Sequence, residues 1–197
     1  MTLGLYIDPG VHALACAWFR DGVLVGTCMA PREEFAPKGW PIPRAQEDAL
    51  VIERMRVYAN KPGKGEDPND LIDVTQAAAF AEGAIVARGG PRALWVYAAD
   101  WKGQIKKPIH HRRIWSVLTP SERAVLAAAI GMTQEAIHEK IEAACKRLAV
   151  TGKVTGYAWT AHNLFDAVGL GLWHLKRVGV AGHRFSVPTE LNLLPRV

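Results

Sequence analysis

The sequence predicts an α/β protein with a five-stranded mixed sheet, in which an antiparallel β-meander comes first and helices flank the sheet. Two observations lead to this prediction. Three short apolar runs follow one another near the start of the chain and are separated only by turn residues. Further along, two more apolar runs alternate with stretches whose apolar residues recur at helical spacing. We expect residues 1–197 to form a single domain, since this length suits one core.

The first three strands are predicted from the turns that separate them. Asp8-Pro9-Gly10 ends the first apolar run and Asp21-Gly22 ends the second, so the three runs form two tight hairpins. The fourth run is short and does not alternate with polar residues, which is typical of a buried strand. The five predicted strands span 3–8, 12–19, 23–29, 49–53 and 93–98.

The first predicted helix covers 71–88, where apolar residues from Leu71 to Ile85 recur three and four positions apart and Asp70 is a candidate N-cap. Stretches rich in proline, glycine and charge predict connecting loops at 31–48 and 60–70. The remaining helices are predicted at 120–129, 134–149 and 164–177.

Composition excludes several classes of protein. With 49% hydrophobic and 22% charged residues, the chain is neither disordered nor fibrous, and it has no apolar stretch long enough to span a membrane. Its first residues lack the pattern of a signal peptide, so we expect a cytoplasmic protein. Cys16, Cys28 and Cys145 form no close pair in the sequence, which predicts neither a disulfide framework nor a zinc site. The net charge of +5 permits a polyanionic partner without demanding one.

Three acidic residues occupy positions typical of catalytic groups. Asp8 ends the first strand, Glu53 ends the fourth, and Asp166 lies in the first turn of the otherwise apolar last helix. Strands commonly end in polar residues, and Asn163 could be an N-cap that Asp166 supports through the helix dipole. Capping does not account for His162. If the helix begins near His162, then residues 162, 163 and 166 share one face.

Carboxylates at these three places would make an oxygen-rich site for hard divalent cations. Mg²⁺ takes few carboxylates and keeps water or phosphate oxygens as its other ligands. Two such ions about 4 Å apart can activate a water and stabilise the leaving oxygen of a phosphodiester. Zinc is disfavoured, because no thiolate or histidine pair stands at ligand spacing.

The residues around these acids resemble those of a known family. Gly4-Leu5-Tyr6-Ile7-Asp8-Pro9-Gly10, Val51-Ile52-Glu53 and His162-Asn163-Leu164-Phe165-Asp166-Ala167 are similar to motifs of the RuvC-type Holliday junction resolvases. The three motifs occur in the family's order over most of the chain. The sequence looks more like the phage-encoded members than the standard bacterial enzyme, and for a phage protein the expected compartment is the host cytoplasm.

The resemblance implies a ribonuclease H-like fold and two-metal hydrolysis of DNA, with two Mg²⁺ or Mn²⁺ ions held by Asp8, Glu53 and Asp166. The family carries Asp or His three residues before the last acid, where this chain has Asn163. An amide can ligate a metal but is no base, so we expect His162 to supply the fourth function, as a ligand or by orienting water. The family acts as homodimers that nick four-way junctions symmetrically. Helix 71–88 is rich in alanine, which favours core packing and would also suit the dimer interface.

Two basic segments are candidates for DNA contact. The stretch 101–115 contains two tryptophans and no acid, and its rings could stack on bases, although a solvated charged loop would have the same composition. Its His110-His111 pair is a poor metal site, since adjacent residues rarely share one ion. The second segment follows Glu53 and contains Tyr58, which related resolvases suggest as a wedge into the junction, or which is a buried tyrosine. The candidate DNA-binding residues are Arg54, Arg56, Tyr58, Lys61, Lys64, Lys102, Lys106, Lys107, Arg112 and Arg113.

Other functions compete with junction resolution. A ribonuclease H-like nuclease acting on flap DNA or RNA–DNA hybrids would carry the same acids, because surfaces rather than acids set substrate shape. A non-catalytic junction-binding protein would also explain the missing fourth carboxylate. An ATPase of the actin and sugar-kinase type is excluded, because the chain has no second phosphate-binding hairpin and is too short for two such domains.

Overall fold

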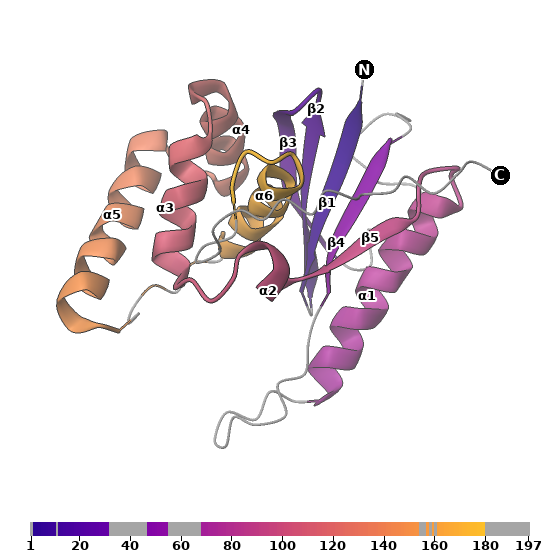
Figure 1. Cartoon of the computed structure of the whole chain (residues 1–197), viewed down its shortest axis with the longest axis horizontal. Helices are drawn as coiled ribbons and strands as arrows, with labels where there is room; N and C mark the ends of the chain where they lie inside the picture. The colour runs from indigo at the N-terminus through magenta and orange to yellow at the C-terminus, as the bar shows by residue number, and fades with distance from the viewer. Residues whose placement is uncertain are drawn as a thin grey trace.

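Five strands form one mixed sheet at the centre of the protein (Figure 1). The computed structural model describes residues 2–10, 12–31, 47–54, 68–153, 157, 159 and 161–179. The strands are β1 (Leu3–Pro9), β2 (Ala13–Arg20), β3 (Val23–Pro31), β4 (Ala49–Arg54) and β5 (Ala93–Tyr97). Their order is β3-β2-β1-β4-β5, with antiparallel pairs up to β1 and parallel pairs beyond it. This is the topology of the ribonuclease H-like fold, so the predicted fold class is confirmed.

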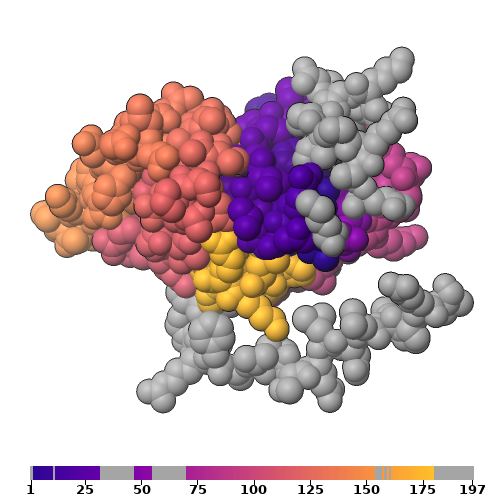
Figure 2. Space-filling model, turned by 90° about the horizontal axis from the view of Figure 1, so that it is seen from above, coloured from indigo at the N-terminus to yellow at the C-terminus, as the bar shows by residue number. Residues whose placement is uncertain are grey.

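Helices cover both faces of the sheet. The helices are α1 (Pro68–Val86), α2 (Ala98–Trp101), α3 (Lys107–Val117), α4 (Pro120–Ile130), α5 (Gln134–Thr151) and α6 (His162–His174). α1 lies on one face, whereas α6 packs on the other and is joined there by α3, α4 and α5 (Figure 1). Figure 2 shows the indigo strands lying between the orange helices and α1. None of the helices in the described part of the chain has the length and apolarity needed to cross a membrane.

Strand alternation divides the buried side chains between two cores. On β1, Leu5 and Ile7 pack in the core beneath α1, whereas Tyr6 packs in the core beneath α6. On β4, the side chain of Ile52 likewise belongs to the α1 core. Successive side chains of a strand point to opposite faces. The residues that follow Ile7 and Ile52 therefore face α6, and these residues are Asp8 and Glu53.

The basic stretch 101–115 contains the last residue of α2 and most of α3, so much of it is helical. α3 begins at Lys107, with a proline in its first turn where a missing N–H costs nothing. Trp101 and Trp115 are only 2% and 5% exposed, so the expectation that these rings stack on bases is wrong. Both indoles belong to the core beneath α6, because burying such large apolar rings outweighs the charge of their neighbours.

Helix ends and one pair of cysteines also differ from expectation. α1 begins at Pro68, which places Asp70 in the first turn rather than at the N-cap. The N-cap of α6 is Ala161, so Asn163 is not the cap. Although Cys16 and Cys28 are distant in the sequence, they face each other directly across β2 and β3, and both are free thiols.

Candidate active site

Asp8, Glu53 and Asp166 come together at one edge of the sheet, and we call them the acid cluster. β1 and β4 are parallel, so their carboxyl ends carry Asp8 and Glu53 to the same edge. The first turns of α6 bring Asp166 to the same face of the sheet. All three side chains are buried, with 5–7% of each residue exposed. Three elements distant in the sequence therefore converge on one small group of carboxylates.

Lys102 lies within the acid cluster. Its Nζ is 3.0 Å from Asp166 Oδ2 and 3.2 Å from Glu53 Oε2, and it also contacts Glu53 Oε1. The sequence predicts Lys102 as one of several DNA-contacting residues, whereas the structure places its ammonium between two of the carboxylates. The lysine is only partly exposed, at 21% of its side chain.

Two further residues contact the acid cluster and escaped the sequence analysis. Trp101 donates a hydrogen bond of 2.8 Å from Nε1 to Glu53 Oε2. His110 Nε2 lies 3.4 Å from Asp166 Oδ1, and no hydrogen-bond partner is found for either ring nitrogen within the described residues. The parallel pairing of β5 with β4 could have indicated these contacts. The chain that leaves β5 emerges at the same edge of the sheet as the ends of β1 and β4, and therefore passes Asp8 and Glu53.

The crowding of negative charge is visible in the pKa values of the acid cluster. Burial raises the pKa of Asp8 well above its usual range, and the charges of Glu53 and Asp166 raise it further. Burial also raises the pKa of Glu53, although Lys102 opposes the effect. For Asp166 burial acts in the same direction, but His110 and Lys102 outweigh it and lower the pKa. The ammonium of Lys102 contacts Glu53 and Asp166, and Asp166, which His110 also approaches, is the one carboxyl of the three whose pKa is lowered.

The donor set fits a divalent cation in chemistry and in charge. Three carboxylates offer the hard oxygen ligands that Mg²⁺ and Mn²⁺ prefer, and a cation would offset the repulsion that raises the pKa of Asp8. In the described residues, no three His, Cys, Asp or Glu side chains already stand in metal-ligand geometry. The ammonium of Lys102 bridges Glu53 and Asp166.

The two candidates for the fourth function lie at the start of α6. His162 is half-buried, and its Nδ1 contacts the carbonyl oxygen of Trp159. With Nδ1 as the donor in this contact, Nε2 keeps a lone pair for a metal or a proton. The side chain of Asn163 reaches toward the end of β1, since a Cβ on Gly10 would lie 3.5 Å from Asn163 Nδ2. The preference for His162 over Asn163 stays a prediction.

His111 belongs to the core rather than to a metal site. Its ring stacks on Phe165 with centroids 4.6 Å apart, and Nδ1 lies 2.7 Å from the hydroxyl oxygen of Tyr157. Burial lowers the pKa of His111 to about 3, so the ring is neutral near physiological pH.

The remaining basic candidates are dispersed over several surfaces. Lys106 and Lys107 are exposed at the start of α3, where Lys106 Nζ donates to the carbonyl oxygen of Gly152. Arg54 lies over the ring of Tyr97 at 5.1 Å from its centroid. Arg56, Tyr58, Lys61 and Lys64 lie outside the described residues.

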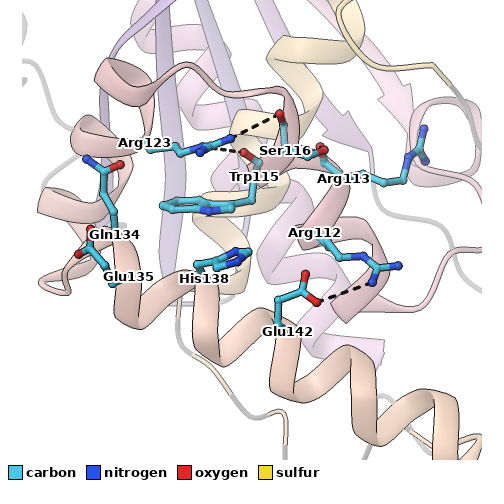
Figure 3. Close-up of a pocket in the computed structure, with 9 residues that line it drawn as sticks. All are labelled: Arg112, Arg113, Trp115, Ser116, Arg123, Gln134, Glu135, His138 and Glu142. Carbon is cyan, nitrogen blue, oxygen red and sulfur yellow. Dashed lines mark hydrogen bonds and ion pairs between the residues drawn. The ribbon is translucent and has the colours of Figure 1, made fainter.

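Arg112 and Arg113 line a pocket of about 600 Å³ between α3, α4 and α5 (Figure 3). Arg112 approaches Glu142 at 3.9 Å, whereas Arg113 donates to the carbonyl oxygen of Gly179. Trp115 lies deep in this pocket beside Arg123, whose Nε donates to the Trp115 carbonyl oxygen. The acid cluster contributes no residue to this pocket.

No protein-family model and no curated protein matches this chain. Several solved structures are similar to it, including two of Thermus thermophilus RuvC. Thermus thermophilus RuvC in complex with a Holliday junction substrate is 13% identical, with a TM-score of 0.41, and the match covers 89% of this chain and 93% of that chain. Thermus thermophilus RuvC is 12% identical, with a TM-score of 0.38 over 88% of this chain and 93% of that chain. Because these similarities are weak, the fold assignment rests on the strand order and directions given above.

Proposed function

We propose that this protein is a divalent-metal-dependent endonuclease that cleaves branched DNA, and that it resolves four-way junctions as a homodimer. The acid cluster carries this proposal. Buried carboxylates are avoided unless they are paired or bind metal, and here three lie together while the ammonium of Lys102 contacts two of them, Glu53 and Asp166. The motifs around them occur in the order typical of RuvC-type resolvases, which adds support from the sequence.

Asp8, Glu53 and Asp166 would hold the cations, with His162 or Asn163 as a further donor. Bound divalent cations lower the pKa of a water and stabilise the leaving oxygen of a phosphodiester. Side chains that contact the acid cluster orient its carboxylates. Trp101 orients the carboxylate of Glu53 by donating from its indole N–H to Oε2, while the ammonium of Lys102 contacts both carboxylate oxygens.

Lys102 and His162 have distinct proposed roles. The ammonium of Lys102 stands beside the carboxylates, where it would meet the non-bridging oxygens of a phosphate brought to the site. His162, with Nδ1 directed to a backbone carbonyl, would take a proton from the attacking water through Nε2.

DNA binding is proposed to rest on basic side chains on several surfaces of the protein. Lysine and arginine bind phosphates without reading sequence, as a structure-selective enzyme requires. Near the cluster, the proposed phosphate contacts follow Glu53 along the chain, with Tyr58 as the residue that enters the junction. The proposed contacts are Arg54, Arg56, Lys61, Lys64, Lys106, Lys107, Arg112 and Arg113.

A non-catalytic junction-binding protein is the second candidate. Two observations favour it: Lys102 already neutralises part of the acid cluster, and Asn163 stands where the family has a carboxylate or a histidine. Such a protein would bind branched DNA through the same surfaces and would leave it intact.

Cleavage and binding of labelled DNA distinguish these functions. We expect Mg²⁺- or Mn²⁺-dependent nicking of a four-way junction, lost on chelation, and loss of nicking with retained binding in Asp8→Asn, Glu53→Gln and Asp166→Asn. Asp21→Asn is the matched control, because this carboxylate lies in the exposed β2–β3 turn and accepts from the backbone of Thr2. It should nick at the wild-type rate.

Each alternative outcome has one meaning. Binding without nicking in saturating Mg²⁺ and Mn²⁺ would establish the non-catalytic function. Faster cleavage of a flap or an RNA–DNA hybrid would move the substrate to that class. Full activity in all three acid variants would remove the acid cluster from the mechanism.

A further inference from the structure

Cys16 and Cys28 form a cross-strand pair on the face of the sheet opposite to the acid cluster. Cys16 on β2 is the direct register partner of Cys28 on β3. Thr27 anchors the pairing from β3 by donating a hydrogen bond of 2.7 Å to the Cys16 carbonyl oxygen. Both thiols belong to the core beneath α1, whereas Asp8 and Glu53 face α6.

The two thiols interact and differ in accessibility. The Cys16 thiol donates to the carbonyl oxygen of Leu14 at 3.9 Å, and it lies beside the Cys28 side chain across the strand pair. Cys16 is fully buried, and burial raises its pKa well above the usual range. Cys28 is only partly buried, and its interaction with the neighbouring Cys16 thiol lowers its pKa. Of the two, Cys28 is therefore the better nucleophile toward a reagent in solvent, and Cys16 is held directly behind it.

The backbone geometry suits a disulfide. Directly opposed residues of antiparallel strands have Cβ atoms about 4.5–5.5 Å apart, and a disulfide needs about 3.5–4.5 Å. Closing this difference takes a small local movement of β3, which is an edge strand of the sheet among the described residues. Cys145 lies on α5 in the other core and cannot reach either thiol.

We propose that Cys16 and Cys28 are a redox-active dithiol, which a small-molecule disulfide such as oxidised glutathione converts into a cross-strand disulfide. The Cys28 thiolate attacks one sulfur of the reagent, its S–S bond breaks, and one glutathione thiolate leaves and takes up a proton. Cys16 then loses its proton to solvent and attacks the Cys28 sulfur of the mixed disulfide, which releases the second glutathione. Two protein thiols are oxidised and one reagent disulfide is reduced. This inference is independent of the proposed nuclease activity.

Thiol counting on the folded full-length chain tests the inference. After incubation of the reduced protein with oxidised glutathione, acid quenching, and alkylation under denaturing conditions, we expect one of the three cysteines to remain alkylatable, with a peptide linking Cys16 to Cys28. Cys145→Ser should retain no free thiol after oxidation. Cys16→Ala should hold glutathione on Cys28 as a stable mixed disulfide.

Several results would overturn the proposal of a redox-active Cys16–Cys28 dithiol. Three alkylatable thiols in the treated folded protein would show that Cys28 does not react. Glutathione retained on Cys28 of the wild-type protein would show that Cys16 does not displace it to form the disulfide. A linkage that involves Cys145 would show that oxidation follows unfolding. Cys28→Ser serves as a second variant if Cys16→Ala does not fold, and it should form no intramolecular disulfide.

Discussion

The buried ion pair between Arg177 and Glu122 anchors the chain just beyond α6, and replacing Arg177 with methionine should destabilise the protein strongly. The guanidinium binds the carboxylate in a bidentate manner, with Nη1 at 2.5 Å from Oε1 and Nη2 at 2.7 Å from Oε2. Nη1 also donates to the carbonyl oxygen of Gly22, in the β2–β3 turn. The side chain of Glu122 is only 1% exposed, so solvent cannot replace the lost partner.

The pKa of Glu122 sets the magnitude. Burial alone would raise this pKa, but hydrogen bonds from Arg177 and from the backbone N–H groups of Leu24 and Thr119 lower it to about 2. The difference from the ordinary value corresponds to about 3 kcal/mol in favour of the charged form. This figure belongs to all of these hydrogen bonds together, so the cost of losing Arg177 is taken from the usual cost of breaking one side of a buried pair, about 3–5 kcal/mol. We therefore expect Arg177→Met to lose about 3 kcal/mol of unfolding free energy near neutral pH.

The pH dependence follows from the sign of the shift. A carboxyl group whose pKa is lowered by folding stabilises the protein above its ordinary pKa, 4.5 for Glu122, and the stabilisation is lost as the pH falls through the folded value. The difference between wild type and Arg177→Met should therefore shrink to about 1.5 kcal/mol at about pH 3.

Urea denaturation of both proteins at the two pH values measures this difference. Arg112→Met is the matched control, because Arg112 is half exposed and approaches Glu142 only at 3.9 Å. It should cost less than about 1 kcal/mol. A cost for Arg177→Met no larger than that of the control, or one that stays constant between the two pH values, would refute the reasoning.

The remaining predictions concern packing, catalysis and DNA binding. A Cβ at Gly169 would lie 2.6 Å from Ile114 Cδ1, so Gly169→Ala should cost about 1–3 kcal/mol in thermal unfolding, while Gly83→Ala, with nothing within 4 Å, should be neutral or stabilising. In junction cleavage assays His162→Ala should lower the rate more than Asn163→Ala, and the reverse ranking would reassign the fourth function. Replacing the basic residues at the start of α3 and within it should reduce the slope of log DNA affinity against log salt concentration. An unchanged slope would contradict a role of these residues in DNA contact. The residues to change are Lys106, Lys107, Arg112 and Arg113.

The sequence alone determined the sheet and the positions of its acids. Apolar runs bounded by Asp8-Pro9-Gly10 and Asp21-Gly22 are local patterns, and the turn residues themselves require the chain to reverse. The small residues of α1 were likewise predicted to pack in the core, and Ala77, Ala78 and Ala81 are buried against the sheet. Whether that helix also joins two protomers stays a prediction.

Tertiary structure alone decided the helical state of 107–117 and the partners of the acid cluster. The basic stretch has no clear local pattern, and its helix is held by packing of Trp115 and His111 against α6. The contacts of Lys102 with Glu53 and Asp166, and the pairing of Cys16 with Cys28, depend on strand register and helix docking. Those arrangements join residues far apart in the chain, and the free energy that fixes them comes from burying the whole core rather than from any local segment.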